Sequence, residues 1–382
     1  MMARMNEARL FPYKRVAGRT YRIEVFPPRR RRGARGRPAI VWFSGGGWRF
    51  GGLGVYDRQC AYLASRGMVA ACAEFRAAGR GRYTAAWAAE DAKAAVRWLR
   101  VNARRLGVDP GRIVAAGESS GATMAAQTAL CPGFEPADEP LGLSSVPNAL
   151  VLLDPPMDWR TLGKLFMRRM GMPEEESRRL TPNLHLRPDM PPAFLAFSRE
   201  DFLIRGLRET ARLVRRLRLP VRVREVRAQP HGFFKVTPWN EISTGWIDRW
   251  LVSIGFLRGR PSIEPPALPF DRGKPVFGRG LPPLPSTAWW WKEAHRFRGL
   301  DPFIRGLSFA PLRGGRLGAM VVFKAGLRPG RARMLRIAAA VSAALSASRR
   351  GLDPVRRLLV CFIAFPHAPV AVWERGILRK LS

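Results

Sequence analysis

Short apolar runs alternate with longer amphipathic stretches over residues 20–255. The runs predict strands, and several are apolar throughout, as is typical of strands that are buried on both faces. The predicted strands are YRIEVF (21–26), AIVWFS (39–44), MVAACAEF (68–75), RIVAAG (112–117), ALVLLD (149–154), AFLAFS (193–198) and VRVREV (221–226).

The stretches between these runs predict helices. Residues 85–107 place apolar side chains on or near one face of a helix, and residues 207–219 show a similar spacing. Strands that alternate with helices form a mostly parallel sheet with helices on both faces. The sequence therefore predicts an α/β fold.

The pattern changes near residue 257. Residues 259–291 are rich in proline and glycine, whereas residues 334–350 predict a helix. The apolar segment 358–373 contains two prolines and a histidine, and it is expected either to be buried or to lie at a membrane surface. We therefore predict one domain over 1–257 and a basic, Pro/Gly/Arg-rich extension over 258–382 that is partly helical or poorly ordered.

The formal net charge of +37 is extreme, and 58 of the 66 basic residues are arginine. This bias, beside abundant alanine, glycine and proline, is typical of GC-rich coding. Scattered arginines without a binding motif predict no specific nucleic-acid partner, and the basic tail is expected to make only weak contact with a membrane surface or a polyanion. The run PPRRRRGARGRP (27–38) joins two predicted strands, so it is interpreted as a solvated loop, with an anion-binding patch as the alternative.

The four cysteines are far apart and show no CxxC spacing, which argues against a zinc site and favours reduced thiols. The opening residues lack an apolar signal region, and no stretch reaches the ~18–20 apolar residues of a membrane-spanning helix. We expect a cytoplasmic monomer or homodimer without cofactor or metal. The cysteines are Cys60, Cys72, Cys131 and Cys361.

The stretch GESSG (117–121) lies between a predicted strand and a run of small residues that suits a helix. A strand–turn–helix frame around G-x-S-x-G is what a nucleophile elbow requires, because the glycines relieve crowding at a strained turn. This context predicts Ser119 as a nucleophile. The backbone N–H of Ser120 would then donate to an oxyanion from the start of the helix. The alternative is a Gly-rich turn without chemistry.

A serine nucleophile needs a base, and the base needs a group that orients it. His231 follows the strand at 221–226, and Asp201 follows the strand at 193–198. Both therefore lie beyond the carboxyl ends of strands, where open α/β sheets place their sites. The order Ser119, Asp201, His231 predicts a triad. Glu200 is the alternative to Asp201.

A second glycine-rich turn, SGGGW (44–48), supplies the other oxyanion donors, Gly45 and Gly46. Together with GESSG, PPAFLAFSRED (191–201) and HGFF (231–234), it resembles the acetyl esterase/lipase group of the α/β-hydrolase superfamily, which is related to the hormone-sensitive-lipase-like esterases. The likeness spans about residues 10–257. It implies an α/β-hydrolase fold with a short cap insertion, plus a C-terminal extension of unknown fold.

The resemblance implies a serine carboxylesterase that acts on short-acyl, small-molecule esters through an acyl-enzyme. Trp48, Glu118 and Pro155 are the candidate substrate-binding residues, although Pro155 lies in LDPPMDW (153–159), which is equally well explained as a proline-rich turn. Residues 160–190 are interpreted as a helical insertion over the site, with ordinary packing or a lid as its two roles.

One residue departs from the family pattern. Ser44 stands where the family usually has a histidine that fixes the oxyanion loop, so the geometry of this loop and the reaction rate are open. The alternative function is accordingly a weakly active or inactive hydrolase relative that acts as a basic binding or scaffold protein. The intact triad favours the enzyme.

Overall fold

The computed structural model describes residues 8–28, 36–48, 52–77, 85–135, 142–162, 173–199, 201–226, 231–235, 239–263, 304–311, 317–323, 330–348, 358–364, 368–374 and 377–380. The chain divides into two compact units. The first comprises residues 1–197, 203–224 and 244–262, and the second comprises residues 198–202, 225–243 and 263–382.

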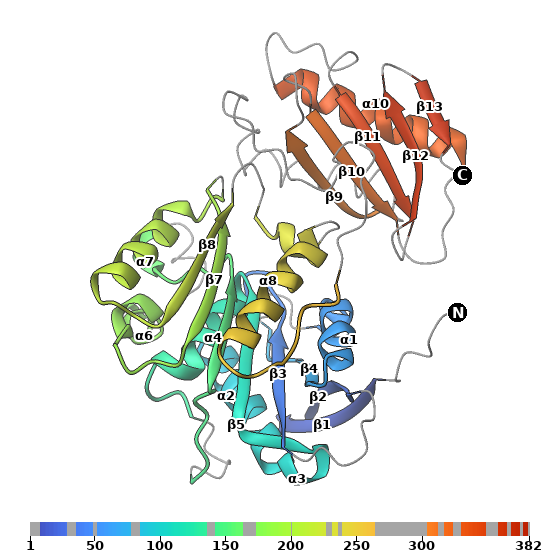
Figure 1. Ribbon diagram of the computed structural model, residues 1–382. Coiled ribbons are helices and arrows are strands. Elements are labelled where there is room, and N and C mark those ends of the chain that lie inside the picture. The colour runs from blue at the N-terminus through green and yellow to red at the C-terminus, as the bar shows by residue number, and fades with distance from the viewer. Residues whose placement is uncertain are drawn as a thin grey trace. The chain divides into compact units, whose positions relative to one another are not determined.

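An eight-stranded sheet forms the frame of the first unit, in the order β1-β2-β4-β3-β5-β6-β7-β8 (Figure 1). Its strands are β1 (Arg9–Val16), β2 (Arg19–Phe26), β3 (Arg37–Phe43), β4 (Val69–Ala73), β5 (Val108–Glu118), β6 (Ala149–Leu153), β7 (Ala193–Ser198) and β8 (Val221–Val226). The helices are α1 (Asp57–Ser65), α2 (Ala85–Val101), α3 (Ala103–Leu106), α4 (Ser120–Leu130), α6 (Glu174–Arg179), α7 (Ile204–Arg216) and α8 (Trp239–Ser253), with short 3₁₀ turns at Trp159–Thr161, Pro182–His185 and Phe233–Lys235.

The sheet is mostly parallel, as the sequence predicts. Only β1 and β2 run antiparallel to their neighbours, whereas β4, β3, β5, β6 and β7 pair in parallel. The edge strand β8 continues the parallel order, because the N–H of Ala193 donates to Pro220 O and the N–H of Arg199 donates to Val226 O, each at 2.9 Å. The carboxyl ends of β5, β6, β7 and β8 therefore share one edge of the sheet.

All seven predicted strands are present, whereas β1 was not predicted. Exposed side chains alternate with partly buried ones along much of this strand, and its sequence, RLFPYKRV, has no continuous apolar run. It forms an antiparallel hairpin with β2 through a turn in which Ala17 and Gly18 both have positive φ, 47° and 76°.

The segment GVDPGR (107–112), which has the composition of a turn, forms a bulge near the start of β5. The register of β3 on β5 passes from Arg37 opposite Val108 to Ala39 opposite Ile113, so several residues of β5 loop out between these pairs. Asp109 stabilises this bulge, because its carboxylate accepts from the N–H of Gly111 at 2.9 Å. The strand then continues without interruption to Glu118.

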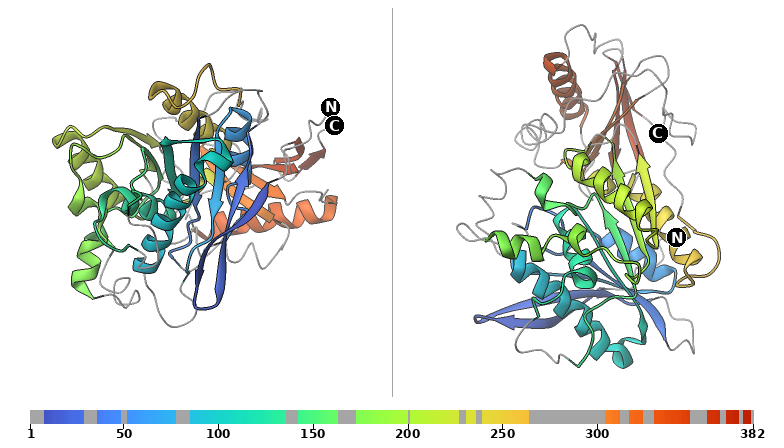
Figure 2. Two further views of the ribbon diagram at one scale, coloured as in Figure 1. Left: turned by 90° about the horizontal axis from the view of Figure 1, so that it is seen from below. Right: turned by 90° about the vertical axis from the view of Figure 1, so that its left-hand side faces the viewer.

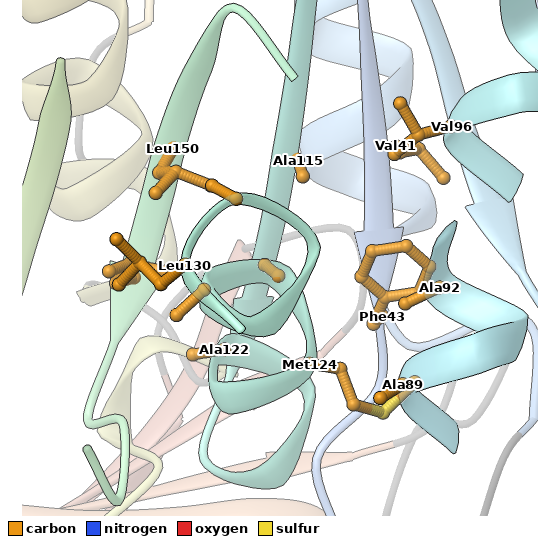
Figure 3. Packing of buried hydrophobic residues seen from close by; sticks show 14 of the residues in the cluster. Val41, Phe43, Ala89, Ala92, Val96, Ala115, Ala122, Met124, Leu130 and Leu150 are labelled. Carbon is orange, nitrogen blue, oxygen red and sulfur yellow. The ribbon is translucent and has the colours of Figure 1, made fainter. Parts of the chain in front are cut away.

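One face of the sheet packs on α2 and α4. Alternate strand residues enter this core, including Val41, Phe43, Ala115 and Leu150 (Figure 3). The two helices contribute mainly alanines and a few larger side chains, so they approach the sheet and each other closely. The helix residues labelled in Figure 3 are Ala89, Ala92, Val96, Ala122, Met124 and Leu130.

The opposite face packs on α1 and α8. Trp42 of β3 stacks on Tyr56, just before α1, with ring centroids 4.6 Å apart, and Phe194 of β7 contacts Trp250 of α8 at 5.9 Å. Arg66 joins the two helices, because its Nε donates to Asp248 Oδ2 at 2.7 Å. Helices therefore cover both faces, as the strand–helix alternation predicts.

The second unit contains a mixed five-stranded sheet in the order β13-β12-β11-β10-β9. The strands are β9 (Ile304–Pro311), β10 (Leu317–Phe323), β11 (Leu358–Ala364), β12 (Ala368–Glu374) and β13 (Ile377–Lys380), and the helix is α10 (Arg331–Ser348). The helix connects the parallel pair β10 and β11. Its residues Met334, Ile337, Ala338 and Val341 are buried at a helical spacing.

This sheet changes the interpretation of the tail. The sequence predicted a partly helical or poorly ordered extension, with 358–373 as one apolar segment. The structure instead divides this segment into the antiparallel strands β11 and β12. Most of the proline-rich stretch 259–291 lies outside the described residues. Within the described ranges, no helix is both long and apolar enough to cross a membrane.

Candidate active site

The turn between β5 and α4 has the geometry of a nucleophile elbow. Ser119 adopts φ 54° and ψ −128°, a conformation that is strained for a residue with a side chain. Two backbone bonds hold it there: its N–H donates to Leu153 O at 2.8 Å, and its carbonyl accepts from the N–H of Thr123 at 3.1 Å. Ser119 is also the one residue of 113–130 that is not buried. The turn therefore presents this serine at the surface of an otherwise buried segment.

Glycine is required on both sides of Ser119. A Cβ at Gly117 would lie 2.3 Å from the carbonyl carbon of Gly121, and a Cβ at Gly121 would lie 2.0 Å from the carbonyl oxygen of Phe43. These neighbours are backbone atoms, which cannot move aside as a flexible side chain can. The two glycines of GESSG therefore allow α4 to start directly against β5 and β3.

We expect Gly121→Ala to destabilise the protein strongly. The added methyl overlaps the backbone of β3, so the variant is expected to lose about 3 kcal/mol or more of unfolding free energy, the upper range of overpacking in a core. Gly142→Ala is the matched control, because nothing lies within 4 Å of its Cβ position. Urea denaturation measures both; equal midpoints for Gly121→Ala and the wild type would contradict the close packing of the elbow.

The glycine-rich turn after β3 lies against the elbow. Gly46 and Gly47 have φ 133° and 62°, and Trp48 has φ 59°, so the chain turns sharply over these residues. A Cβ at Gly45 would lie 2.5 Å from Glu118 Oε2 and 3.1 Å from Ser119 Cβ. The loop backbone therefore packs directly against Glu118 and Ser119, with no room for a side chain at position 45.

Glu118 lies beneath this loop instead of facing solvent. Its exposure is 1%, and its carboxylate is next to Gly45. Burial, followed by the negative charge of Glu118, raises the pKa of Tyr56 well above its usual value, so this phenol stays neutral. The placement favours a role for Glu118 in holding the oxyanion loop over the predicted direct contact with substrate.

Ser44 occupies the position where the resemblance predicts a histidine. It is 4% exposed, and its hydroxyl has no hydrogen-bond partner among the described residues. We expect Ser44→Ala to keep kcat/KM within about threefold and to raise stability by up to ~1 kcal/mol, because a buried hydroxyl without a partner is unfavourable. Enzyme kinetics and urea denaturation test this; a tenfold loss of activity would show that the hydroxyl positions the loop.

Hydrogen bonds join the turn LDPPMDW, after β6, to β7 and α4. The N–H of Asp154, which has φ 45°, donates to Ala196 O of β7 at 2.9 Å. The carbonyl of Pro156 accepts from Thr123 Oγ1 at 3.2 Å and from Trp159 Nε1 at 3.0 Å. Pro155 is buried within this turn, so both its predicted substrate contact and the simple turn remain open.

Trp159 brings this turn to the oxyanion loop. Its ring meets that of Trp48 edge to face, with centroids 5.3 Å apart and an interplanar angle of 77°. Both rings are almost fully buried, at 1% and 2% exposure. The sequence identified Trp48 but missed Trp159, whose only signal was its place three residues beyond the two prolines.

The second unit holds the other two predicted triad residues. His231 Nδ1 lies 2.7 Å from Asp201 Oδ2, and both side chains are buried. A carboxylate offers only acceptors, so Nδ1–H donates to it, which selects the tautomer with the lone pair on Nε2. This is the arrangement of a general base with its orienting acid. Glu200, the alternative acid, lies outside the described residues.

Phe202 contacts the same imidazole. Its ring lies 4.7 Å from that of His231 at an angle of 58°, and the residue is 53% exposed. A half-exposed aromatic ring beside a buried histidine limits the access of water to one side of the pair. No pattern in the sequence indicated a role for Phe202.

The structure thus brings the predicted residues together in two groups. The first unit holds Ser119, Ser120, Gly45 and Glu118 within one strand–turn–helix and its neighbouring loop. The second unit holds Asp201 and His231. Asp154, Asp201 and His231 are of the types that could hold a metal ion. The absence of a metal therefore stays a prediction.

The cap insertion is described only in part. Within it, α6 and the turn Pro182–His185 are described, whereas residues 163–172 are not. Gln127 of α4 donates to Leu180 O at 2.8 Å, which ties the insertion to the helix behind the elbow. Its role as packing or as a lid stays open.

Comparison with known proteins agrees with this geometry. Residues 40–235, about half of the chain, match the family model of the alpha/beta hydrolase fold. The chain belongs to the α/β-hydrolase family. Within this family it is similar to esterases: the apo structure of Thermogutta terrifontis esterase 2 matches with a TM-score of 0.62 and 31% identity, over 68% of this chain and 98% of that chain.

Curated sequences of the α/β-hydrolase family match over a shorter stretch. Carboxylesterase NlhH of Mycobacterium tuberculosis is 37% identical over 90 residues, which is 23% of this chain and 28% of that protein. Esterase LipI of the same organism is 38% identical over 90 residues, with the same coverage. The similarity therefore spans just over a quarter of the length of these relatives.

Proposed function

We propose that the protein is a serine carboxylesterase that hydrolyses short-acyl esters through an acyl-enzyme intermediate. The observation that carries this proposal is the strained and accessible Ser119 at the end of a buried strand. A turn that costs conformational energy persists where function requires it. The buried pair of Asp201 and His231 supplies the chemistry that such a serine needs.

The topology supports a meeting of Ser119 and His231. Asp201 follows β7 by three residues and His231 follows β8 by five, whereas Ser119 follows β5 directly. These strands are parallel, so the three residues leave the same edge of the sheet. We propose that His231 Nε2 faces Ser119 Oγ there.

The proposed reaction begins as His231 Nε2 takes the proton of Ser119 Oγ, which attacks the ester carbonyl carbon. The resulting oxyanion accepts hydrogen bonds from the N–H groups of Ser120 and of Gly45 or Gly46. His231 then protonates the alkoxide as the carbon–oxygen bond breaks, and the alcohol leaves. Water loses a proton to His231, attacks the acyl-enzyme, and releases the acid as the proton returns to Ser119.

Other residues of the site stabilise the imidazolium and the oxyanion that form during the reaction. Asp201 stabilises the imidazolium that forms in each step, and the removal of one oxyanion donor costs about 100- to 1000-fold in kcat. Glu118 holds the loop that contains these donors. The two buried tryptophans, Trp48 and Trp159, pack against each other beside the loop, and we propose that they restrict the site to short acyl groups.

The similar proteins support the same reaction class. Thermogutta terrifontis esterase 2 has been solved phosphorylated by paraoxon and with propionate or butyrate bound. Reaction with an organophosphate is typical of an activated serine, and the two acids are short acyl products. We propose the same chemistry for this chain.

A series of p-nitrophenyl esters from two to twelve acyl carbons tests the proposal. We expect kcat/KM to be highest at two to four carbons and to fall at least about tenfold at eight, since the acyl pocket is expected to be small. The absence of hydrolysis for every ester, with a folded protein, would contradict the esterase proposal.

That negative result would favour the second candidate, a weakly active or inactive relative that acts as a basic binding or scaffold protein. The observation that supports this candidate is Ser44, whose buried hydroxyl has no partner among the described residues where the family usually has a histidine. A loop held less firmly would lower the rate at every chain length equally.

A further inference from the structure

The outer face of α7 is formed by arginines. Residues 205, 208, 212, 215 and 216 are all exposed arginines, and at 100° per residue they fall within an arc of about 100°. The opposite side of the helix is buried through Leu207, Ala211 and Val214. The helix is therefore strongly amphipathic, and its polar face is almost entirely positive, with Glu209 as the one acidic residue of α7.

The following residues extend this charge. Arg218 and Arg222, after the helix and on the edge strand β8, are also exposed. We name these seven positions the arginine face: Arg205, Arg208, Arg212, Arg215, Arg216, Arg218 and Arg222. In the right-hand view of Figure 2, α7 lies on the side of the molecule that faces the reader.

Little acidic charge neutralises the arginine face. Between residues 203 and 224 the chain has eight arginines and a single acidic residue, Glu209. Its carboxylate lies 3.5 Å from Arg212, whose side chain is still 71% exposed, so this ion pair is weak. Such a concentration of unneutralised charge attracts an anionic partner.

An exposed apolar side chain flanks these arginines in the chain. Leu217, directly after α7 and in the same unit, is 36% exposed. Arginines bind the phosphates of lipid headgroups. Apolar side chains bind favourably at the boundary between the headgroups and the acyl chains, where their surface leaves water. A nucleic-acid duplex offers the phosphates alone, so the combination favours a lipid surface.

We propose that the arginine face is a docking surface for an anionic phospholipid bilayer. The proposal goes beyond ester hydrolysis and does not depend on it. It also places membrane contact on the first unit, whereas the sequence analysis expected weak contact through the tail. The arginines would contact lipid phosphates along the ~20 Å length of α7.

Vesicle sedimentation of the full-length protein tests this docking. The vesicles contain phosphatidylcholine with 30% phosphatidylserine, or phosphatidylcholine alone, at about 150 mM salt. One variant replaces Arg205, Arg208, Arg212 and Arg215 by glutamine. The matched control loses the same charge from exposed positions elsewhere in the first unit, namely Arg9, Arg15, Arg22 and Arg104.

The wild type is expected to sediment with the anionic vesicles only. An arginine near an anionic surface raises the partition coefficient about fivefold, so the loss of four is expected to weaken the binding of the α7 variant by about 100- to 600-fold, and that of the control by less than about threefold. Circular dichroism checks that each variant folds. If the quadruple variant does not fold, the double variant Arg205→Gln/Arg208→Gln replaces it, and its binding is expected to be weaker by about tenfold or more.

Three results would overturn the proposal. Equal losses in the α7 variant and the control would mean that only the net charge acts. Wild-type protein that ignores anionic vesicles at this salt would exclude a lipid docking surface. Retention of a 20-base-pair DNA duplex at the same salt, without vesicle binding, would assign the arginine face to nucleic acid instead.

Discussion

Replacement of Ser119 by alanine is expected to lower kcat for a short-acyl ester by about 10⁴- to 10⁶-fold. The acyl-enzyme cannot form without Oγ, and only binding and the oxyanion donors would remain to accelerate the attack of water. The fold should persist, because the elbow is held by the backbone bonds of Ser119 to Leu153 and Thr123, which alanine keeps. Initial rates with p-nitrophenyl acetate measure the effect.

Ser120→Ala is the matched control for the other serine of GESSG. Its proposed role belongs to the backbone N–H, which alanine retains, and its buried hydroxyl has no partner among the described side chains and backbone groups. We expect its kcat to stay within about tenfold of the wild type. If Ser120→Ala were the inactive variant and Ser119→Ala the active one, the assignment of the nucleophile would be wrong.

Asp201→Asn is expected to lower kcat by about 10⁴-fold. The amide removes the charge that stabilises the imidazolium, and it can hold the imidazole in the wrong tautomer by donating to Nδ1. Because the hydrogen bond between Asp201 and His231 is only 2.7 Å long and buried, water cannot replace it easily.

Glu200→Gln is the control that separates the two neighbouring acids. We expect its kcat to stay within about threefold of the wild type, since Asp201 occupies the position beside the imidazole. Steady-state kinetics and near-UV circular dichroism on both variants test the assignment. A large loss in Glu200→Gln with little loss in Asp201→Asn would transfer the orienting role to Glu200.

The strands of the first unit were predictable because helices cover both faces of their sheet. Such strands need continuous apolar runs, and AIVWFS or ALVLLD can hardly form another structure in this context. The edge strand β1 has solvent on part of its surface, so its sequence alternates and includes arginine, lysine and proline. Its pairing with β2 is a tertiary effect that the local pattern does not contain.

Helix ends were less predictable than helix positions. The predicted helix over 85–107 breaks at Asn102 into α2 and α3, and Gly107 then ends α3 with φ 70°. Asn102 donates from its side chain to Trp98 O at 2.8 Å, so it competes with the backbone of its own helix.

The candidate site could be predicted in part. The elbow has a local signature, since glycines on both sides of Ser119 are required by backbone contacts that the structure shows. The hydrogen bond between Asp201 and His231, 30 residues apart, follows from the parallel pairing of β7 and β8, which the strand order alone indicates. The buried position of Glu118 was not predictable, because it depends on how the loop after β3 folds back.

The tail shows the limit of such patterns. Segment 358–373 was treated as one apolar stretch, yet it contains the antiparallel strands β11 and β12, whose pairing shifts register between Phe362 and Ile363. Continuous hydrophobicity does not distinguish one long buried segment from two consecutive strands. The parallel partner of β10, by contrast, is β11, which lies far along the chain: Leu317 pairs with Leu358.

Labelling with paraoxon tests the central claim most directly. The protein is incubated with the organophosphate, and intact mass and peptide mass spectrometry locate the adduct while ester hydrolysis is followed in the same sample. We predict one diethylphosphoryl group on Ser119, loss of activity in proportion to labelling, and no adduct in Ser119→Ala. An adduct on another residue, or full labelling of Ser119 without loss of hydrolysis, would contradict the proposed nucleophile.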